Sequence, residues 1–273
     1  MTDNKLSNDA SESIGAIVYQ FYVALDKCFE LEPGESVYIE KFGDVSNSTE
    51  QIEVKHYSDS LTDAHLNFWN TIKNWTSDNF EDSKFKYLIL LTTQDFGPTT
   101  KFASWNESTI DERLTILSQI KDEAILRYSK ALEKDKNKKK SQSLQLMELV
   151  LEPGSADRLK DVLIKVIIAD SSPLPKDYYD RIKTRYLKGI PAVNKEVAMQ
   201  SALGLIVNPE IINGTFEITE EIFSKQFQEI TAQYNSTTII FPKKHLEITV
   251  DESERSKHLN ENYIKKILEI EYD

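Results

Sequence analysis

The sequence has few of the residues that build disulfides and metal clusters. Its 273 residues include one cysteine, Cys28, and four histidines that show no metal-ligand spacing. One cysteine cannot form a disulfide within the chain, and no cysteine-based zinc cluster can be built from it. This composition predicts a protein of a reducing compartment.

Long apolar runs are missing as well. No stretch reaches the roughly 20 apolar residues that a membrane-spanning helix needs. The N-terminal residues MTDNKLSNDASES lack the apolar core of a signal peptide. These absences predict a cytoplasmic protein without a membrane segment.

Positive charge is in deficit. The chain has 45 acidic and 33 basic residues, which gives a formal net charge of -12. Such a charge repels phosphate backbones, so any nucleic-acid site has to be local. Hydrophobic residues make up 40% of the chain, which is enough for the core of one large domain or two smaller ones.

The spacing of apolar residues predicts an α/β protein in which helices flank a mixed sheet. Apolar side chains recur at helical spacing from Ile14 to Phe29, and Glu32-Pro33-Gly34 ends this pattern. Alternating β-branched residues then predict strands, and a nearly continuous apolar run predicts a strand deep in the sheet. The expected elements that follow are strands at 36–40 and 51–57, a helix at 61–75, a buried strand at 85–92 and a helix at 109–132.

A lysine-rich run at residues 134–140 predicts a boundary between two domains. We expect a sheet-containing domain over residues 1–135 and a mainly helical domain for partner binding and assembly over residues 141–273. The run itself has two interpretations, an exposed linker or a set of phosphate contacts. In the second domain the pattern predicts helices at 144–151, 156–168, 175–187, 195–207, 219–234 and 259–270 and a strand at 236–241.

Three residues near the first two strands form a pattern with a chemical meaning. Glu53 and Lys55 stand at positions i and i+2 of a strand, so their side chains share one face. Asp44 lies in the turn before that strand, and hairpin pairing would bring its carboxylate close to Glu53. Two carboxylates and a backbone carbonyl suit a hard divalent cation, and Lys55 beside them would act on a nucleophilic water or on a scissile phosphate.

This pattern resembles the motif of the PD-(D/E)xK nuclease superfamily, which has the restriction-endonuclease-like fold. A closer resemblance is to the double-stranded DNA endonuclease domain of bacterial antiphage effectors, which include CBASS nuclease effectors and the nuclease subunit of Lamassu systems. The likeness covers about residues 12 to 105. Its residues are Gly15-x-x-x-Tyr19-Gln20, Tyr38-Ile-Glu40, Asp44, Ile52-Glu-Val-Lys-His56 and Thr92-Thr93-Gln94.

The resemblance implies a DNA endonuclease that depends on Mg²⁺ or Mn²⁺ and serves as an effector of antiphage defence. It assigns Asp44 and Glu53 to the metal and Lys55 to catalysis, with Glu40 and Gln20 as further site residues. It also implies partners: double-stranded DNA as substrate, an SMC-like ATPase and a small accessory subunit that hold the nuclease inactive, and further copies in an active homo-oligomer. The sequence departs from the superfamily motif where Phe-Gly precedes Asp44 in place of proline.

Two other interpretations stay open at this point. Glu53 and Lys55 alone are also what a solvated strand face with an ion pair would show, and such a pair contributes under about 1 kcal/mol. The chain could also be a catalytically inactive nuclease-fold module that acts in DNA docking or complex assembly. An inactive module has no chemical need for Asp44, Glu53 and Lys55 together, which disfavours this second interpretation.

Overall fold

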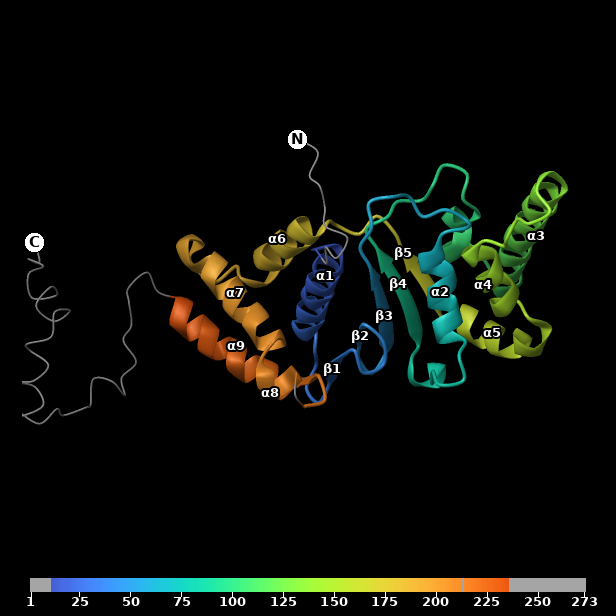
Figure 1. Ribbon diagram of the computed structural model, residues 1–273. Coiled ribbons are helices and arrows are strands. Elements are labelled where there is room, and N and C mark those ends of the chain that lie inside the picture. Colours follow the sequence, from blue (N-terminus) through green and yellow to red (C-terminus); the bar gives the residue numbers. More distant parts are fainter. Residues whose placement is uncertain (1–10, 213, 236–273) are drawn as a thin grey trace, which may run out of the picture. The chain divides into compact units, whose positions relative to one another are not determined.

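A six-stranded mixed sheet organises the protein (Figure 1). The computed structural model describes residues 11–212 and 214–235. The strand order is β5-β4-β3-β2-β1-β6; the pairs from β6 to β3 are antiparallel, and β3, β4 and β5 are parallel. The predicted α/β class with a mixed sheet is thus confirmed. The strands are β1 (Ser36–Ile39), β2 (Val45–Ser46), β3 (Glu50–Lys55), β4 (Tyr87–Thr92), β5 (Val166–Ala169) and β6 (Glu217–Thr219).

Helices cover both faces of this sheet and bury two apolar layers. On one face lie α1 (Ser11–Cys28), α6 (Pro175–Tyr186), α7 (Lys195–Ile206) and α9 (Glu220–Tyr234). On the other lie α2 (Leu66–Trp75), α3 (Ile110–Lys134), α4 (Gln142–Val150) and α5 (Ala156–Leu163). A short helix, α8 (Pro209–Ile212), precedes β6. Within the described ranges no helix combines the length and apolarity needed to cross a membrane.

Strand β3 presents an apolar face to α1 and a polar face to the α2 side. Ile52 and Val54 belong to the apolar layer around α1. Because side chains alternate along a strand, Gln51, Glu53 and Lys55 point to the opposite face. There the indole of Trp75 on α2 donates a hydrogen bond to the amide oxygen of Gln51. The polar face of β3 therefore runs from a buried amide at its beginning to a lysine at its end.

Three strands differ from the expectation. The segment 156–168 was expected to be one helix, but α5 ends at Leu163 and β5 begins at Val166. The apolar run 166–169 fits a helix face and a buried strand equally well, and parallel pairing with β4 decides in favour of the strand. Strands β2 and β6 are only two and three residues long, too short for a periodic pattern to indicate them.

The lysine-rich run 134–140 does not divide the described chain into two domains. Strands β5 and β6 follow the run in sequence, yet both join the sheet that the first 135 residues begin. Helix α4 packs on α2 and α3, and the described residues up to Asn235 form one compact unit. A solvated charge run can be a turn between packed helices as well as a linker, and here it is the turn between α3 and α4. The strand expected at 236–241 and the helix expected at 259–270 lie outside the described residues.

Replacing Gly43 with alanine is expected to destabilise the fold by at least about 2 kcal/mol. Gly43 has φ = 114°, and an added Cβ would lie 2.0 Å from Nε2 of the buried Gln51 side chain. Gly204→Ala in α7 is the matched control, because nothing lies within 4 Å of its added Cβ and alanine favours a helix by about 0.5–1 kcal/mol. Urea unfolding of both variants tests this; equal stability changes would contradict it.

Candidate active site at the polar face of strand β3

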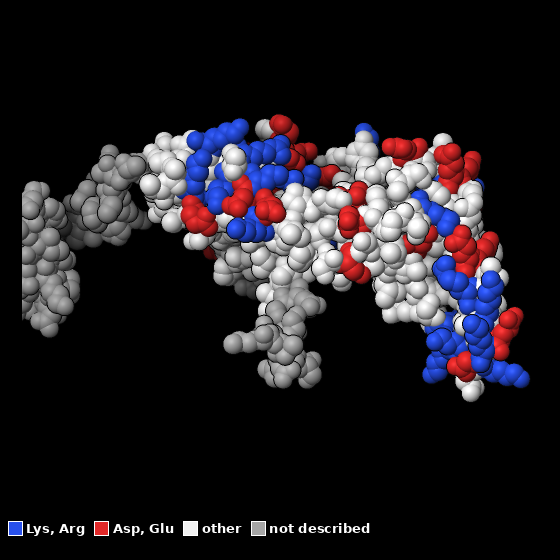
Figure 2. All heavy atoms as spheres, turned by 90° about the horizontal axis from the view of Figure 1, so that it is seen from above, with Lys and Arg blue, Asp and Glu red and all other residues white. Residues whose placement is uncertain are grey.

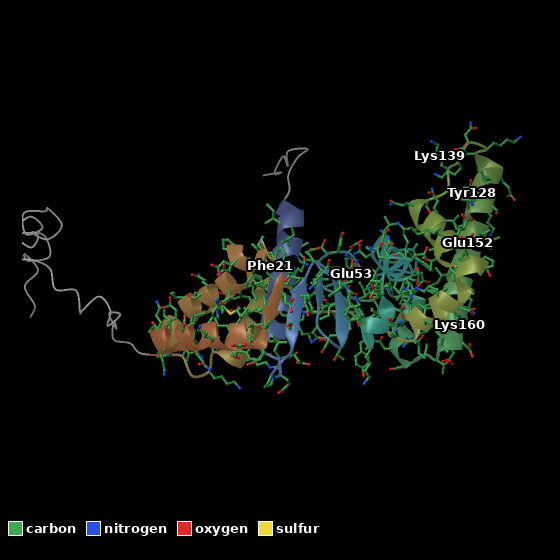
Figure 3. The ribbon with its side chains drawn as sticks, turned by 90° about the horizontal axis from the view of Figure 1, so that it is seen from below. Phe21, Glu53, Tyr128, Lys139, Glu152 and Lys160 are labelled. Atoms are coloured by element: carbon green, nitrogen blue, oxygen red, sulfur yellow. The ribbon has the colours of Figure 1, made fainter. Side chains whose placement is uncertain are left out.

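Asp44 and Glu53 lie side by side because β2 and β3 form a tight antiparallel pair. The register places Val45 opposite Ile52, so Asp44, one residue earlier, faces Glu53. The backbone N–H of Val54 donates a 2.7 Å hydrogen bond to Asp44 Oδ2 and fixes this carboxylate on β3. The structure thus brings together the two carboxylates that the sequence pattern placed near each other. Figure 3 shows Glu53 on the sheet, between the helices of its two faces.

Lys55 inserts its ammonium group between these carboxylates. Its Nζ lies 2.7 Å from Glu53 Oε1 and 4.0 Å from Asp44 Oδ2. The side chains of Asp44, Glu53 and Lys55 are 22%, 13% and 21% exposed, so this is a recessed group and not a solvated ion pair on a strand face. Water screens these charges much less than charges on an open surface.

Burial and repulsion make the charged form of Asp44 unfavourable. Desolvation, followed by the charge of Glu53, raises the pKa of Asp44 to about 6, although Lys55 and the Val54 N–H oppose the shift. Burial alone would lower the pKa of Lys55, but the charges of Glu53 and Asp44 outweigh it and the pKa is raised. The site therefore holds one well-anchored cation and an excess of negative charge.

Gln20 and Glu40 hold the loop that carries Asp44. Gln20 comes from α1 and is 5% exposed; its Nε2 donates to Glu40 Oε1 at 2.9 Å and to the Asp44 carbonyl at 2.7 Å. The N–H of Glu40 donates to the same carbonyl at 3.1 Å. Glu40 is exposed and has φ = 58°, a backbone conformation that reverses the chain direction after β1. Gln20 is thus a positioning residue, and Glu40 stands at the rim of the site.

The carboxylates fit a divalent cation with many water ligands. Across residues 11–212 and 214–235, no group of three or more His, Cys, Asp or Glu side chains is arranged to hold a metal ion. Asp44 and Glu53 use only Oδ2 and Oε1 for contacts within the described chain, which leaves Oδ1 and Oε2 for a ligand. Mg²⁺ commonly takes one or two protein carboxylates and fills its other positions with water and substrate phosphate. Asp44 and Glu53 could hold such an ion, and its charge would relieve their repulsion.

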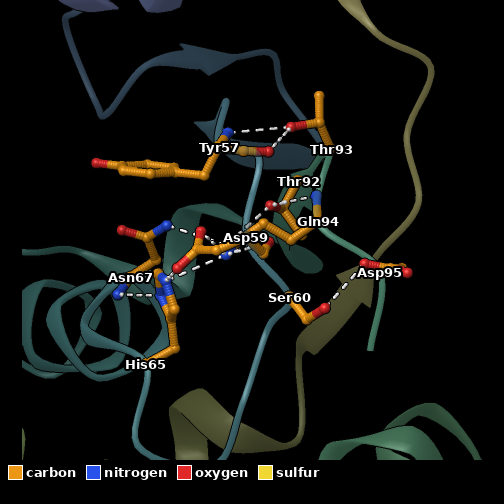
Figure 4. A network of polar contacts seen from close by, with 9 residues as sticks. All are labelled: Tyr57, Asp59, Ser60, His65, Asn67, Thr92, Thr93, Gln94 and Asp95. Carbon is orange, nitrogen blue, oxygen red and sulfur yellow. Dashed lines mark hydrogen bonds and ion pairs between the residues drawn. The ribbon is translucent and has the colours of Figure 1, made fainter. Parts of the chain in front are cut away.

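A polar network anchors the loop that leaves β3 after Lys55 (Figure 4). Thr93 Oγ1 accepts from the Tyr57 N–H at 3.0 Å and donates to the Tyr57 carbonyl at 2.8 Å. Buried Gln94 donates to the carbonyl and the carboxylate of Asp59, and accepts from Asn67 Nδ2 at 3.0 Å. These bonds tie the end of β4 to the loop after β3 and so fix the backbone on which Lys55 stands.

His65 completes this network through both of its ring nitrogens. Its Nδ1 accepts the Asn67 N–H at the start of α2, so the proton resides on Nε2, 3.0 Å from Asp59 Oδ2. Neither His65 nor Asp59 was among the expected site residues. The resemblance did single out Thr92-Thr93-Gln94 at the end of β4, but only the fold shows that Thr93 and Gln94 act on the loop after Lys55.

Comparisons with protein-family models, with curated proteins and with solved structures find no match. What points to chemistry at this place is the geometry itself. Two recessed carboxylates and a lysine converge on one face of β3, and a buried glutamine holds the adjoining loop.

Proposed function

We propose that this protein is a metal-dependent DNA endonuclease. The observation that supports this most is the position of Lys55, whose Nζ lies within 4.0 Å of both Asp44 and Glu53 in a recessed site. A lysine in a purely structural ion pair needs only one carboxylate, because a second carboxylate beside the first adds repulsion. Two carboxylates held together against their repulsion are what a cation-assisted phosphodiester hydrolysis requires.

Each residue has a separate task in this hydrolysis. A divalent cation bound by Asp44 and Glu53 would lower the pKa of a water ligand and neutralise phosphate charge. Lys55 donates hydrogen bonds to the oxygens of the scissile phosphate, where negative charge grows during in-line attack. Gln20 keeps the Asp44 backbone in place through its 2.7 Å hydrogen bond. Glu40 accepts a hydrogen bond from the side-chain amide of Gln20 and so stabilises the rim of the site.

The resemblance of the motif adds a biological setting to this proposal. In that setting the protein is a cytoplasmic effector of antiphage defence that uses Mg²⁺ or Mn²⁺ and cuts double-stranded DNA. An SMC-like ATPase and a small accessory subunit would restrain it, and a homo-oligomer would be its active form. The net charge of -12 supports restraint of the single chain, since it opposes binding to DNA without further contacts.

Plasmid cleavage with Mg²⁺, with Mn²⁺ and with EDTA tests the proposed activity. We expect nicked or linear DNA with either metal and none with EDTA, across a range of protein concentrations. The concentration series tests whether cleavage increases when the chain assembles into an oligomer. Intact plasmid under all metal conditions, together with DNA binding by gel shift, would instead identify a catalytically inactive docking module.

The basic hairpin, defined as residues 127–140 at the turn between α3 and α4, is expected to contact DNA phosphates. It carries seven basic and two acidic residues in a chain that is acidic overall, and blue side chains gather at one end of the molecule in Figure 2. Figure 3 labels Lys139 at this turn. Changing Lys136, Lys138 and Lys139 to glutamine should weaken DNA binding about tenfold or more at 0.1 M salt and reduce the salt slope by up to about 3.

The control for the basic hairpin is a triple variant with the same charge change elsewhere. Lys176, Lys188 and Lys225 are exposed and lie outside the basic hairpin, so their change to glutamine should leave most of the DNA affinity and the salt slope in place. Fluorescence anisotropy with a labelled duplex at several salt concentrations measures both quantities. Equal losses in the two triple variants would show that the basic hairpin makes no specific contribution.

A further inference from the structure

A pocket of about 400 Å³ opens on the same side of the sheet as the candidate active site. This volume is within the range of roughly 300–1,000 Å³ that is typical of small-molecule sites. Its walls come from the loop between β1 and β2, from the last turn of α2 and from the segment that follows α2. Residues that define its character are Lys41, Phe42, Asn74, Asn79, Phe80 and Lys84.

One wall of the pocket belongs to the loop between β1 and β2, which also carries two residues of the candidate active site. Lys41, Phe42 and Gly43 line it, and the neighbours of this tripeptide in sequence are Glu40 and Asp44 of the candidate site. Gly43 packs directly on the amide of Gln51, whose strand neighbour on the same face is Glu53. Two residues along a strand span about 7 Å. The pocket is therefore next to the loop that carries Asp44, and it opens on the side of the sheet to which the carboxylates point.

Its chemistry combines aromatic surface with two lysines and one carboxylate, Glu81. The Lys84 and Lys41 ammonium groups lie 4.7 and 5.4 Å from the centroid of the Phe42 ring. Phe80 and Phe85 stack nearly parallel with centroids 6.0 Å apart and add a second apolar wall. This combination suits a ligand with a flat ring and a negative charge.

The carboxylates that now neutralise these lysines are weak competitors for a ligand. Lys84 pairs with Glu81 at 2.7 Å, and Lys41 pairs with Glu217 at 3.5 Å. The side chains of Lys84 and Glu81 are 45% and 66% exposed, so solvent screens their attraction. Those of Lys41 and Glu217 are 35% and 30% exposed, and solvent screens this longer contact in part. Exposed pairs of this kind contribute at most about 1 kcal/mol. A phosphate group with its higher charge can take their place.

We propose that this pocket is a nucleotide subsite that holds a nucleotide of the DNA strand next to the scissile phosphate. The inference rests on the proposed nuclease function. Lys41 and Lys84 bind the phosphate, and the base lies against Phe80. The amides of Asn74 and Asn79 face the base edge, and such amides pair well with N6 and N7 of adenine. The subsite positions the strand so that the following phosphate reaches Lys55.

Nucleotide binding without metal tests the subsite independently of cleavage. The probe is deoxyadenosine monophosphate in EDTA. Its binding is measured by titration calorimetry and by tryptophan fluorescence, because Trp75 forms a hydrogen bond with Gln51 beside the pocket. We expect saturable binding that weakens at least tenfold in the double variant K41Q/K84Q. The control double variant K73Q/K86Q removes two exposed lysines outside the pocket and should bind like the wild type.

Three results would overturn the subsite: no binding of the mononucleotide by the wild type, equal losses in both double variants, or no competition from the oligonucleotide (dA)8. Competition by (dA)8 supports a subsite for a strand, whereas its absence means a site for free nucleotides. Phe80→Ala, checked by circular dichroism for its fold, should also lose binding at least fivefold. If the wild type cuts no DNA with any metal yet binds as expected, the nuclease proposal fails and nucleotide binding at the pocket stands.

Discussion

Lys55→Ala is expected to slow DNA cleavage about 10²–10³-fold, the usual cost of removing one donor that stabilises transition-state charge. Lys55 reaches both carboxylates of the site and stands at the end of β3, where a phosphate can approach. The loss should appear in kcat more than in KM, because the charge that Lys55 stabilises develops during the reaction.

A structural effect of the same substitution has to be separated from the chemical one. Without the ammonium group, Asp44 and Glu53 face each other, so the variant should also lose stability at neutral pH. Lys27→Ala is a matched control: Lys27 is 22% exposed and pairs at 2.5 Å with Glu50 at the other end of β3. It should lose a similar amount of stability and keep its cleavage rate. Similar cleavage losses in the two variants would remove Lys55 from the chemistry.

Local sequence rules were sufficient to predict the centre of the site. The alternation along β3 predicted that Glu53 and Lys55 share a face, and the turn residues before β3 predicted that Asp44 comes near them. Both are consequences of short-range geometry, because a strand repeats every two residues and a tight pair fixes its register. Gln20 was named from a family likeness alone; its bond to the Asp44 carbonyl depends on how α1 packs on the sheet.

The parts of the fold and of the site that were not predicted depend on contacts between segments far apart in sequence. Strand β5 was missed because its four apolar residues also fit a helix, and only the neighbouring β4 decides between them. The nucleotide subsite joins Lys41 to Lys84, and no local pattern reports such a meeting. The domain boundary expected at the lysine-rich run was wrong for a similar reason. A charged, exposed segment gives no information about which elements before and after it pack together.

Asp44→Asn is expected to stabilise the metal-free protein by about 2 kcal/mol at pH 7 and to abolish cleavage. Burial and the charge of Glu53 raise the pKa of Asp44 to about 6, whereas an unfolded aspartate has a pKa of about 3.9. Between these values the folded state holds more protons than the unfolded state. The free energy of unfolding therefore falls as pH rises from about 4 to about 6, by about 2–3 kcal/mol. Asparagine has no charge, and its side-chain oxygen can still accept the Val54 N–H.

Urea unfolding from pH 4 to 8 in EDTA measures this contribution. The wild type should lose stability over this window relative to Asp44→Asn, and the exposed Asp78→Asn control should follow the wild type. A difference between Asp44→Asn and wild type that does not change with pH would contradict the raised pKa.

Adding Mg²⁺ then connects the repulsion between Asp44 and Glu53 to the proposed function. A cation that binds only the folded state stabilises it in proportion to the logarithm of its concentration, and protons compete with it for Asp44. Millimolar Mg²⁺ should therefore raise the melting temperature of the wild type above pH 6, with little effect at pH 4. Asp44→Asn lacks the charge and should gain nothing at either pH. A gain of equal size in the variant would place any bound cation elsewhere, and the repulsion between Asp44 and Glu53 would then need another explanation.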